Sequence, residues 1–172
     1  MNDAAADNTL LLNLTSRLES YGKKMADFML PEPLETQSEI QKEHARRDVL
    51  SSSQLYLSFY SKLNKEQMTV FEEIQASIQQ ASARTFYIDG GPGRGKSFLL
   101  KTIVHFTRSI GKIALCCAST GFVAIMYPEG RTAHNLFRIP VREDDFDMVK
   151  IECDILMNSQ RAELLQHAHV II

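Results

Sequence analysis

The sequence has little net charge, few cysteines and no pattern typical of a disulfide framework. Nineteen Lys and Arg against 21 Asp and Glu leave a formal net charge of −2, so no overall positive field indicates a nucleic-acid partner, although a local basic groove stays compatible with this charge. The three cysteines, Cys116, Cys117 and Cys153, are odd in number and lack C-x-x-C spacing. This favours free thiols in a reducing compartment, with the adjacent pair buried in its apolar run, over disulfides or metal ligands.

Long apolar runs are also missing. Residues 10–12 form a short leucine run without the basic residues that precede a signal core, and no stretch reaches the ~20 apolar residues that span a membrane. With 44% hydrophobic and 23% charged residues, the composition is that of an ordinary globular protein. We therefore expect an intracellular, water-soluble chain with no membrane partner.

The glycine-rich stretch at residues 90–97 is the most informative feature that is present. It fits G-x4-G-K-[ST], the pattern of a phosphate-binding loop, and it stands between an apolar run at 85–88 and apolar residues at helical spacing at 98–106. Glycines let successive N–H groups point at one anion, and a helix start adds further N–H groups and partial positive charge. The pattern predicts a nucleoside triphosphate site built by Gly90, Gly91, Pro92, Gly93, Arg94, Gly95, Lys96 and Ser97.

Two side chains of this loop have predicted roles. Lys96 is expected to reach the β- and γ-phosphates, and the Ser97 hydroxyl is expected to ligate Mg²⁺. A dinucleotide-binding fingerprint fits less well, because Lys96 stands where its third glycine belongs. Phosphate binding is therefore the favoured interpretation.

The chain divides near residue 62 into an extension, residues 1–61, and a second part, residues 62–172. In the extension we expect an amphipathic helix at 10–29 that ends at Pro31 and Pro33, a solvated helix or mobile linker at 34–49, and a break at the serines 51–53.

The second part alternates between apolar strands and amphipathic helices. We expect a helix from Asn64 to residue 78, a buried strand at 85–88, a helix at 98–106, a strand at 113–117, a helix at 122–126, an acidic loop at 142–150, a helix at 159–168 and a strand at 169–172. This alternation predicts an α/β fold with a parallel sheet covered on both faces.

Four sequence blocks in this part resemble one family. They are L-N-K-E-Q at 63–67, the loop at 90–97, A-S-T-G at 118–121 and G-R-T-A-H-N-L-F-R-I-P at 130–140. In this order and spacing they resemble the amino-terminal part of PIF-type DNA helicases of superfamily one, in particular those of Helitron transposons. A weaker likeness extends to 10–33 and 153–172. The resemblance implies a P-loop NTPase with an incomplete RecA-like parallel sheet, flanking helices and a preceding helical extension.

The resemblance also implies an activity and ligands. It implies an ATP-dependent helicase that moves from 5′ to 3′, binds ATP and Mg²⁺, and acts on single-stranded or forked DNA. Gln67 takes the place of the adenine-reading glutamine, with a capping box to Asn64 as the alternative. Nuclear localisation, with the mitochondrion as the alternative, and roles in DNA repair, recombination and telomere maintenance are expectations from the family alone.

The remaining implied contacts are with the DNA strand. Ser119, Thr120 and Gly121 resemble the motif that holds the strand backbone, and Thr132 and His134 resemble the next contacting pair. The alternative for Thr120 is an ordinary helix cap. A further residue, Phe137, has two open interpretations, a base-stacking residue or a core phenylalanine.

The sequence departs from the family pattern at three places. Arg94 replaces a small residue in the loop, and residues 122–124 are bulkier than usual. In the family, the strand that resembles 169–172 is followed by Asp-Glu and later by a second RecA-like domain, whereas this chain stops at Ile172. We therefore expect the chain alone to bind nucleotide weakly and hydrolyse little. The alternatives are another P-loop enzyme, such as a small-molecule kinase or remodelling ATPase, and a non-catalytic transposon-derived remnant.

Overall fold

The computed structural model describes residues 10–11, 14–15, 18, 23–31, 33, 38–45, 49–140 and 153–172. The expected acidic loop at 142–150 and part of the expected helix at 10–29 lie outside these residues. Among the described helices, none is both long and apolar enough to cross a membrane. From Met25 onward the elements are η1 (Met25–Phe28), α2 (Glu39–Ala45), α3 (Val49–Tyr60), α4 (Lys65–Gln79), α5 (Lys96–Ser109), β1 (Ala114–Leu115), β2 (Cys117–Ala118), α6 (Gly121–Ala124), β3 (Arg131–Thr132), α7 (Ala133–Phe137), α8 (Gln160–Gln166) and β4 (Val170–Ile171).

Helices α4 and α5 form the main core, as their apolar spacing predicts. Asn64 begins α4 by accepting a hydrogen bond from the Gln67 N–H at 2.9 Å. One face of α4 is buried, and α5 is buried on all sides from Thr102 to Arg108. The shared cluster consists of Leu63, Phe71, Ile74, Ile78, Leu99, Ile103 and Phe106. The expected helices at 64–78 and 98–106 are therefore confirmed.

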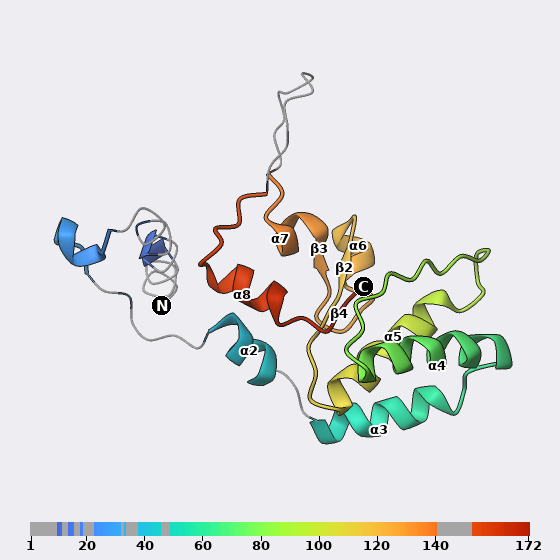
Figure 1. Cartoon of the computed structure of the whole chain (residues 1–172). Helices are drawn as coiled ribbons and strands as arrows, with labels where there is room; N and C mark the ends of the chain where they lie inside the picture. Colours follow the sequence, from blue (N-terminus) through green and yellow to red (C-terminus); the bar gives the residue numbers. More distant parts are fainter. Residues whose placement is uncertain are drawn as a thin grey trace, which may run out of the picture.

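Helix α3 lies upstream of residue 62 and packs against α5 (Figure 1). Its Tyr56 and Tyr60 rings meet Phe71 and Phe106, with Tyr56 and Phe106 centroids 5.4 Å apart. The predicted break at the serines 51–53 is wrong, because α3 runs through them. Ser53 donates its hydroxyl to the Val49 carbonyl at 2.8 Å, which satisfies the side chain inside the helix.

The charged stretch at 34–49 contains α2, whose acidic face is not solvated. The Glu43 side chain is only 2% exposed, and Glu39 forms an ion pair with Arg161 at 2.9 Å. The prediction of a solvated helix is therefore wrong for the face of α2 that carries Glu39 and Glu43, whereas Gln41, Lys42 and His44 are exposed. Charge density alone indicated solvent, but these carboxylates have guanidinium partners far away in the sequence.

The strands form two short parallel pairs. Strand β1 pairs with β4, with Ala114 opposite Val170, and β2 pairs with β3, with Ala118 opposite Thr132. The expected strand at 113–117 is split at Cys116, whose carbonyl accepts from the Arg131 N–H at 3.0 Å. The structure thus mixes helices with small parallel strand pairs, in line with the α/β prediction. The expected helix at 159–168 and strand at 169–172 appear as α8 and β4.

The expected buried strand at 85–88 is not formed. These residues have no strand assignment, and Tyr87 is 91% exposed. Phe86 and Ile88 do pack on the helical core, but a cavity of about 910 Å³ lies between this segment and Val170 of β4. A ladder needs a neighbouring backbone within about 5 Å. Residues 85–88, although rich in strand-forming residue types, are therefore a segment outside any sheet, and its Phe86 and Ile88 side chains pack on the helical core.

The cysteines differ in their surroundings, which gives a first prediction. All three are free thiols; Cys116 is buried and Cys153 is exposed. Burial, as the main cause, raises the pKa of the Cys116 thiol to about 11, so almost no thiolate forms near neutral pH. We expect iodoacetamide at pH 8 to alkylate Cys153 while leaving Cys116 unmodified until denaturant is added. Peptide mass mapping measures this, and equal labelling of both thiols in the folded chain would contradict the burial of Cys116.

Candidate functional site

The candidate phosphate-binding loop runs into α5 as the motif predicts. Gly93 and Gly95 have φ values of +72° and +78°. This left-handed backbone conformation is strained for residues that carry a Cβ atom, so it favours glycine. Gly95 is the N-cap of α5, so the helix begins at Lys96. The loop and helix of the predicted strand–loop–helix unit are therefore present, whereas the strand before them is not.

The two predicted phosphate-site side chains lie at the start of α5. The Lys96 ammonium donates to the carbonyl oxygens of Gly90 and Gly91, the latter at 2.9 Å. The Ser97 hydroxyl oxygen lies 3.5 Å from the hydroxyl of Tyr127, which follows α6. An ammonium, a hydroxyl and a glycine backbone are donor and ligand types that suit a phosphate chain with its magnesium ion. Among the described residues, no group of three or more His, Cys, Asp or Glu could hold a metal by itself.

Gln67 contacts both α4 and the candidate loop. Its Oε1 accepts from the Asn64 N–H at 3.1 Å, which completes a capping box. Its Nε2 donates to the Arg94 carbonyl at 3.2 Å, and a Cβ at Gly95 would lie 2.5 Å from that Nε2. The capping alternative is therefore confirmed, while the adenine role stays a prediction. The same side chain also joins the start of α4 to the loop.

The predicted DNA-contacting residues gather at the carboxyl ends of β2 and β3. Because these strands are parallel neighbours, Ser119, Thr120 and Gly121 leave one strand beside Thr132 at the end of the other. A Cβ at Gly121 would lie 4.0 Å from the Thr132 Cγ2. His134 follows in α7 and is exposed, as are residues 119–121. We call these five residues the strand-end cluster.

Both threonines of the strand-end cluster are helix caps. The Thr120 hydroxyl oxygen accepts from the Val123 N–H at 3.4 Å, and the Thr132 hydroxyl oxygen accepts from the Asn135 N–H at 3.2 Å. The capping alternative for Thr120 is therefore confirmed. Each hydroxyl still has its own O–H to donate to another acceptor, so capping does not remove the threonine as a ligand for a phosphate oxygen.

The exposed aromatic residue near the cluster is not the one that the sequence suggested. Phe137 packs partly buried on the core cluster that contains Leu136 and Leu164, so the core interpretation is confirmed. Phe122, in α6 beside Gly121, is 80% exposed. Sequence reasoning noted Phe122 only as a bulky departure. Tyr127, which contacts Ser97, had no motif to mark it.

Comparison with known families gives a match over the second part of the chain. A family model described as PIF1-like helicase matches residues 62–172, which is well over half of the 172 residues. All four motif blocks quoted above lie within the matched residues. No curated protein matches the chain.

Proposed function

Because this chain belongs to the PIF1-like helicase family, we propose that it serves ATP-driven DNA unwinding in the 5′-to-3′ direction, by binding ATP with Mg²⁺ and single-stranded DNA. The family match confirms the resemblance that the motif blocks indicated, and a helicase acts on nucleic acid. The observation that most supports the finer proposal is the geometry of the candidate loop, in which Lys96 and Ser97 begin α5 directly after Gly95 with its φ of +78°. This arrangement brings an ammonium, a hydroxyl and the N–H groups of a helix start together at one point.

The candidate loop can perform the nucleotide part with its own atoms. Phosphate oxygens would replace the Gly90 and Gly91 carbonyls as partners of the Lys96 ammonium, because a dianionic acceptor is stronger than a neutral carbonyl. Lys96 would then offset the charge that develops on the transferred phosphoryl group. Ser97 would hold Mg²⁺, which supplies further positive charge to the phosphates. Gln67 donates to the Arg94 carbonyl of the loop, and in this proposal it would take the adenine ring as its partner.

The strand-end cluster can perform the DNA part without reading sequence. The hydroxyls of Ser119, Thr120 and Thr132 and the backbone at Gly121 can donate to phosphate oxygens, and such contacts position a strand whatever its bases. His134 adds an exposed ring with two nitrogens to the same edge. Helicases must move along any sequence, so backbone contacts of this kind suit the proposed reaction.

A tryptophan reporter tests whether DNA occupies the strand-end cluster. The chain contains no tryptophan, so Phe122→Trp supplies a single indole beside Gly121. We expect oligothymidylate to quench this fluorescence in a saturable way that weakens as salt rises, because bases stack on exposed aromatics and phosphate contacts release counterions.

The matched control is Tyr87→Trp, since Tyr87 is also a highly exposed aromatic residue and lies outside the cluster. It should show no quenching with oligothymidylate. Equal quenching of both reporters, or of neither, would contradict DNA binding at this cluster. Loss of the Phe122→Trp response in a Thr132→Val background would support it further, because valine keeps the shape and removes the hydroxyl.

A further inference from the structure

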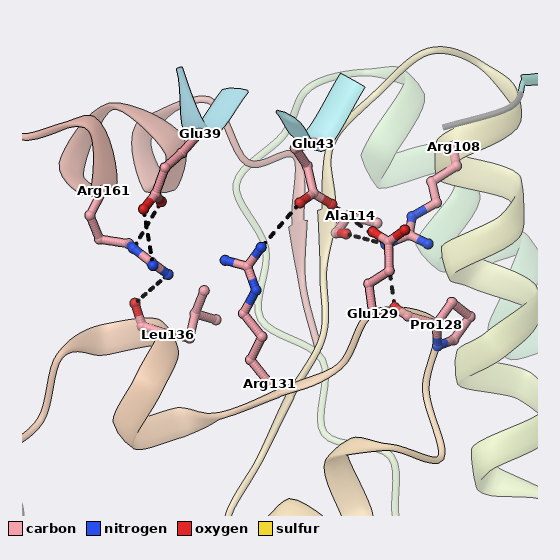
Figure 2. A network of polar contacts seen from close by, with 9 residues as sticks. All are labelled: Glu39, Glu43, Arg108, Ala114, Pro128, Glu129, Arg131, Leu136 and Arg161. Carbon is pink, nitrogen blue, oxygen red and sulfur yellow. Dashed lines mark hydrogen bonds and ion pairs between the residues drawn. The ribbon is translucent and has the colours of Figure 1, made fainter. Parts of the chain in front are cut away.

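Helix α2 presents two acidic side chains to the rest of the chain. Glu39 and Glu43 are four residues apart and therefore lie on one face of the helix. Figure 2 shows both carboxylates pointing at guanidinium groups that come from other elements. This helix lies outside the matched residues 62–172, so the family does not account for these contacts.

Glu43 lies between two arginines from distant segments. Its Oε1 is 3.6 Å from Nη2 of Arg108, and its Oε2 is 3.5 Å from Nη2 of Arg131 (Figure 2). Arg108 belongs to the last turn of α5, the helix that starts at the candidate loop. Arg131 is the first residue of β3 and directly precedes Thr132. A single carboxylate therefore joins the nucleotide-loop helix to the strand that ends at the strand-end cluster.

Arg108, one of the two partners of Glu43, has further partners of its own. The Arg108 Nη2 also lies 3.4 Å from the Ala114 and Pro128 carbonyl oxygens and 3.5 Å from a Glu129 carboxylate oxygen. Two carboxylates thus face two guanidinium groups, with Glu43 and Arg108 buried and Arg131 and Glu129 partly exposed. Burying a carboxylate costs several kcal/mol of desolvation, so such pairs often add little to stability. Their best-attested contribution is to fix one arrangement of the segments that they join.

We propose that Glu43 is a positioning residue of the strand-end cluster. Its ion pairs hold β3, and with it Thr132 and His134, in one position relative to the end of α5. The inference rests on the proposed function, because it takes Thr132 and His134 as DNA contacts. It assigns to the upstream extension a part in DNA binding that no motif of the chain indicates.

Glu39 offers a matched control on the same helix. Its carboxylate pairs with Arg161 of α8, with Nε 2.9 Å from Oε2 and Nη2 3.1 Å from Oε1. Arg161 contacts the Leu136 carbonyl at 3.5 Å rather than β3. Glu39→Gln therefore removes an ion pair between α2 and the rest of the chain and leaves the ion pair of Glu43 with Arg131 in place. If α2 acted only through general stability, the two glutamine variants would behave alike.

The experiment compares Glu43→Gln with Glu39→Gln in the full chain. Hydrogen exchange with mass spectrometry follows the amides of β3, and anisotropy of labelled oligothymidylate gives the DNA affinity. We expect Glu43→Gln to speed exchange at Arg131 and Thr132 and to weaken DNA binding, each by about tenfold. We expect Glu39→Gln to leave both within about twofold of the parent chain.

Glu43→Gln could unfold the chain, because it leaves the guanidinium groups of Arg108 and Arg131 without the Glu43 carboxylate. A double variant keeps the test decisive in that case. Glu43→Gln with Arg131→Met removes one charge of each sign, so the melting temperature should recover while fast exchange at Thr132 remains. Slow exchange at β3 in both Glu43 variants, or equal effects of the Glu39 and Glu43 changes, would overturn the positioning role. If the parent chain binds no oligothymidylate, the proposed function fails, and the exchange data still decide whether Glu43 holds β3.

Discussion

Replacing Lys96 with alanine is expected to weaken the binding of a fluorescent, non-hydrolysable ATP analogue by at least about 100-fold. The ammonium would donate to the β- and γ-phosphates, and each hydrogen bond to a charged group contributes about 1.5–3 kcal/mol. Two such bonds account for the expected loss. Fluorescence anisotropy with Mg²⁺ present, at several concentrations of the chain, measures the change.

The structure adds a second reason for a large effect of Lys96→Ala. Without nucleotide, the Lys96 ammonium holds the Gly90 and Gly91 carbonyls, so alanine also frees one end of the loop. A loop that must be ordered by the ligand binds it less tightly, because ordering entropy is lost at that moment.

Lys101→Ala is the matched control for the Lys96 variant. Lys101 belongs to the same helix, α5, but lies more than one helical turn beyond the loop. Its replacement by alanine also removes one positive charge. Its nucleotide affinity should stay within about twofold of the parent chain. Unchanged affinity in Lys96→Ala, or equal losses in both variants, would contradict the phosphate-binding role of the loop.

Replacing Gly130 with alanine is expected to destabilise the fold by about 3 kcal/mol. A Cβ at this position would lie 2.0 Å from the Ala124 carbonyl oxygen and 2.9 Å from its carbon. Both are backbone atoms at the end of α6, so no side-chain rotation relieves the clash. Either α6 or the start of β3 must move. Thermal unfolding should report a melting temperature lower by about 6–12 °C.

The Gly130 change should also reach the strand-end cluster. Gly130 directly precedes Arg131 and Thr132 in β3, so a shift there moves Thr132 away from Gly121. Gly111→Ala is the control. Gly111 has a φ of +75°, but a Cβ there would meet no heavy atom within 4 Å, so it carries only the left-handed strain of about 1–2 kcal/mol. A melting temperature that falls as much in Gly111→Ala as in Gly130→Ala would contradict the close approach to Ala124.

The features that the sequence predicted correctly depend on residues close together in the chain. The loop at 90–97, the start of α5 and the cap that Asn64 provides for α4 all follow from spacings of a few residues. Local hydrogen bonds and helical periodicity determine such features, so they can be recognised without any knowledge of distant partners. The family assignment has the same origin, because its motif blocks are local patterns.

Apart from the break expected at the serines 51–53, the failed predictions needed a partner from elsewhere in the chain. The segment at 85–88 has strand composition, yet a cavity stands between it and β4, and ladder pairing depends on that neighbour. Phe122 and Phe137 are the same residue type, and only packing decided that Phe122 is exposed while Phe137 lies on the core. No local pattern distinguishes these two rings.

Glu43 shows most clearly how local sequence and distant contacts differ in what they determine. In the sequence it belongs to a charged stretch, which indicates solvent, because an isolated buried carboxylate is costly. In the structure it is buried between Arg108 and Arg131, which lie 65 and 88 residues away along the chain. The sequence alone determined the loop, helices α4, α5 and α8, and the family. Only tertiary structure decided which charges are buried together, because burial and ion pairing are properties of segments that meet after folding.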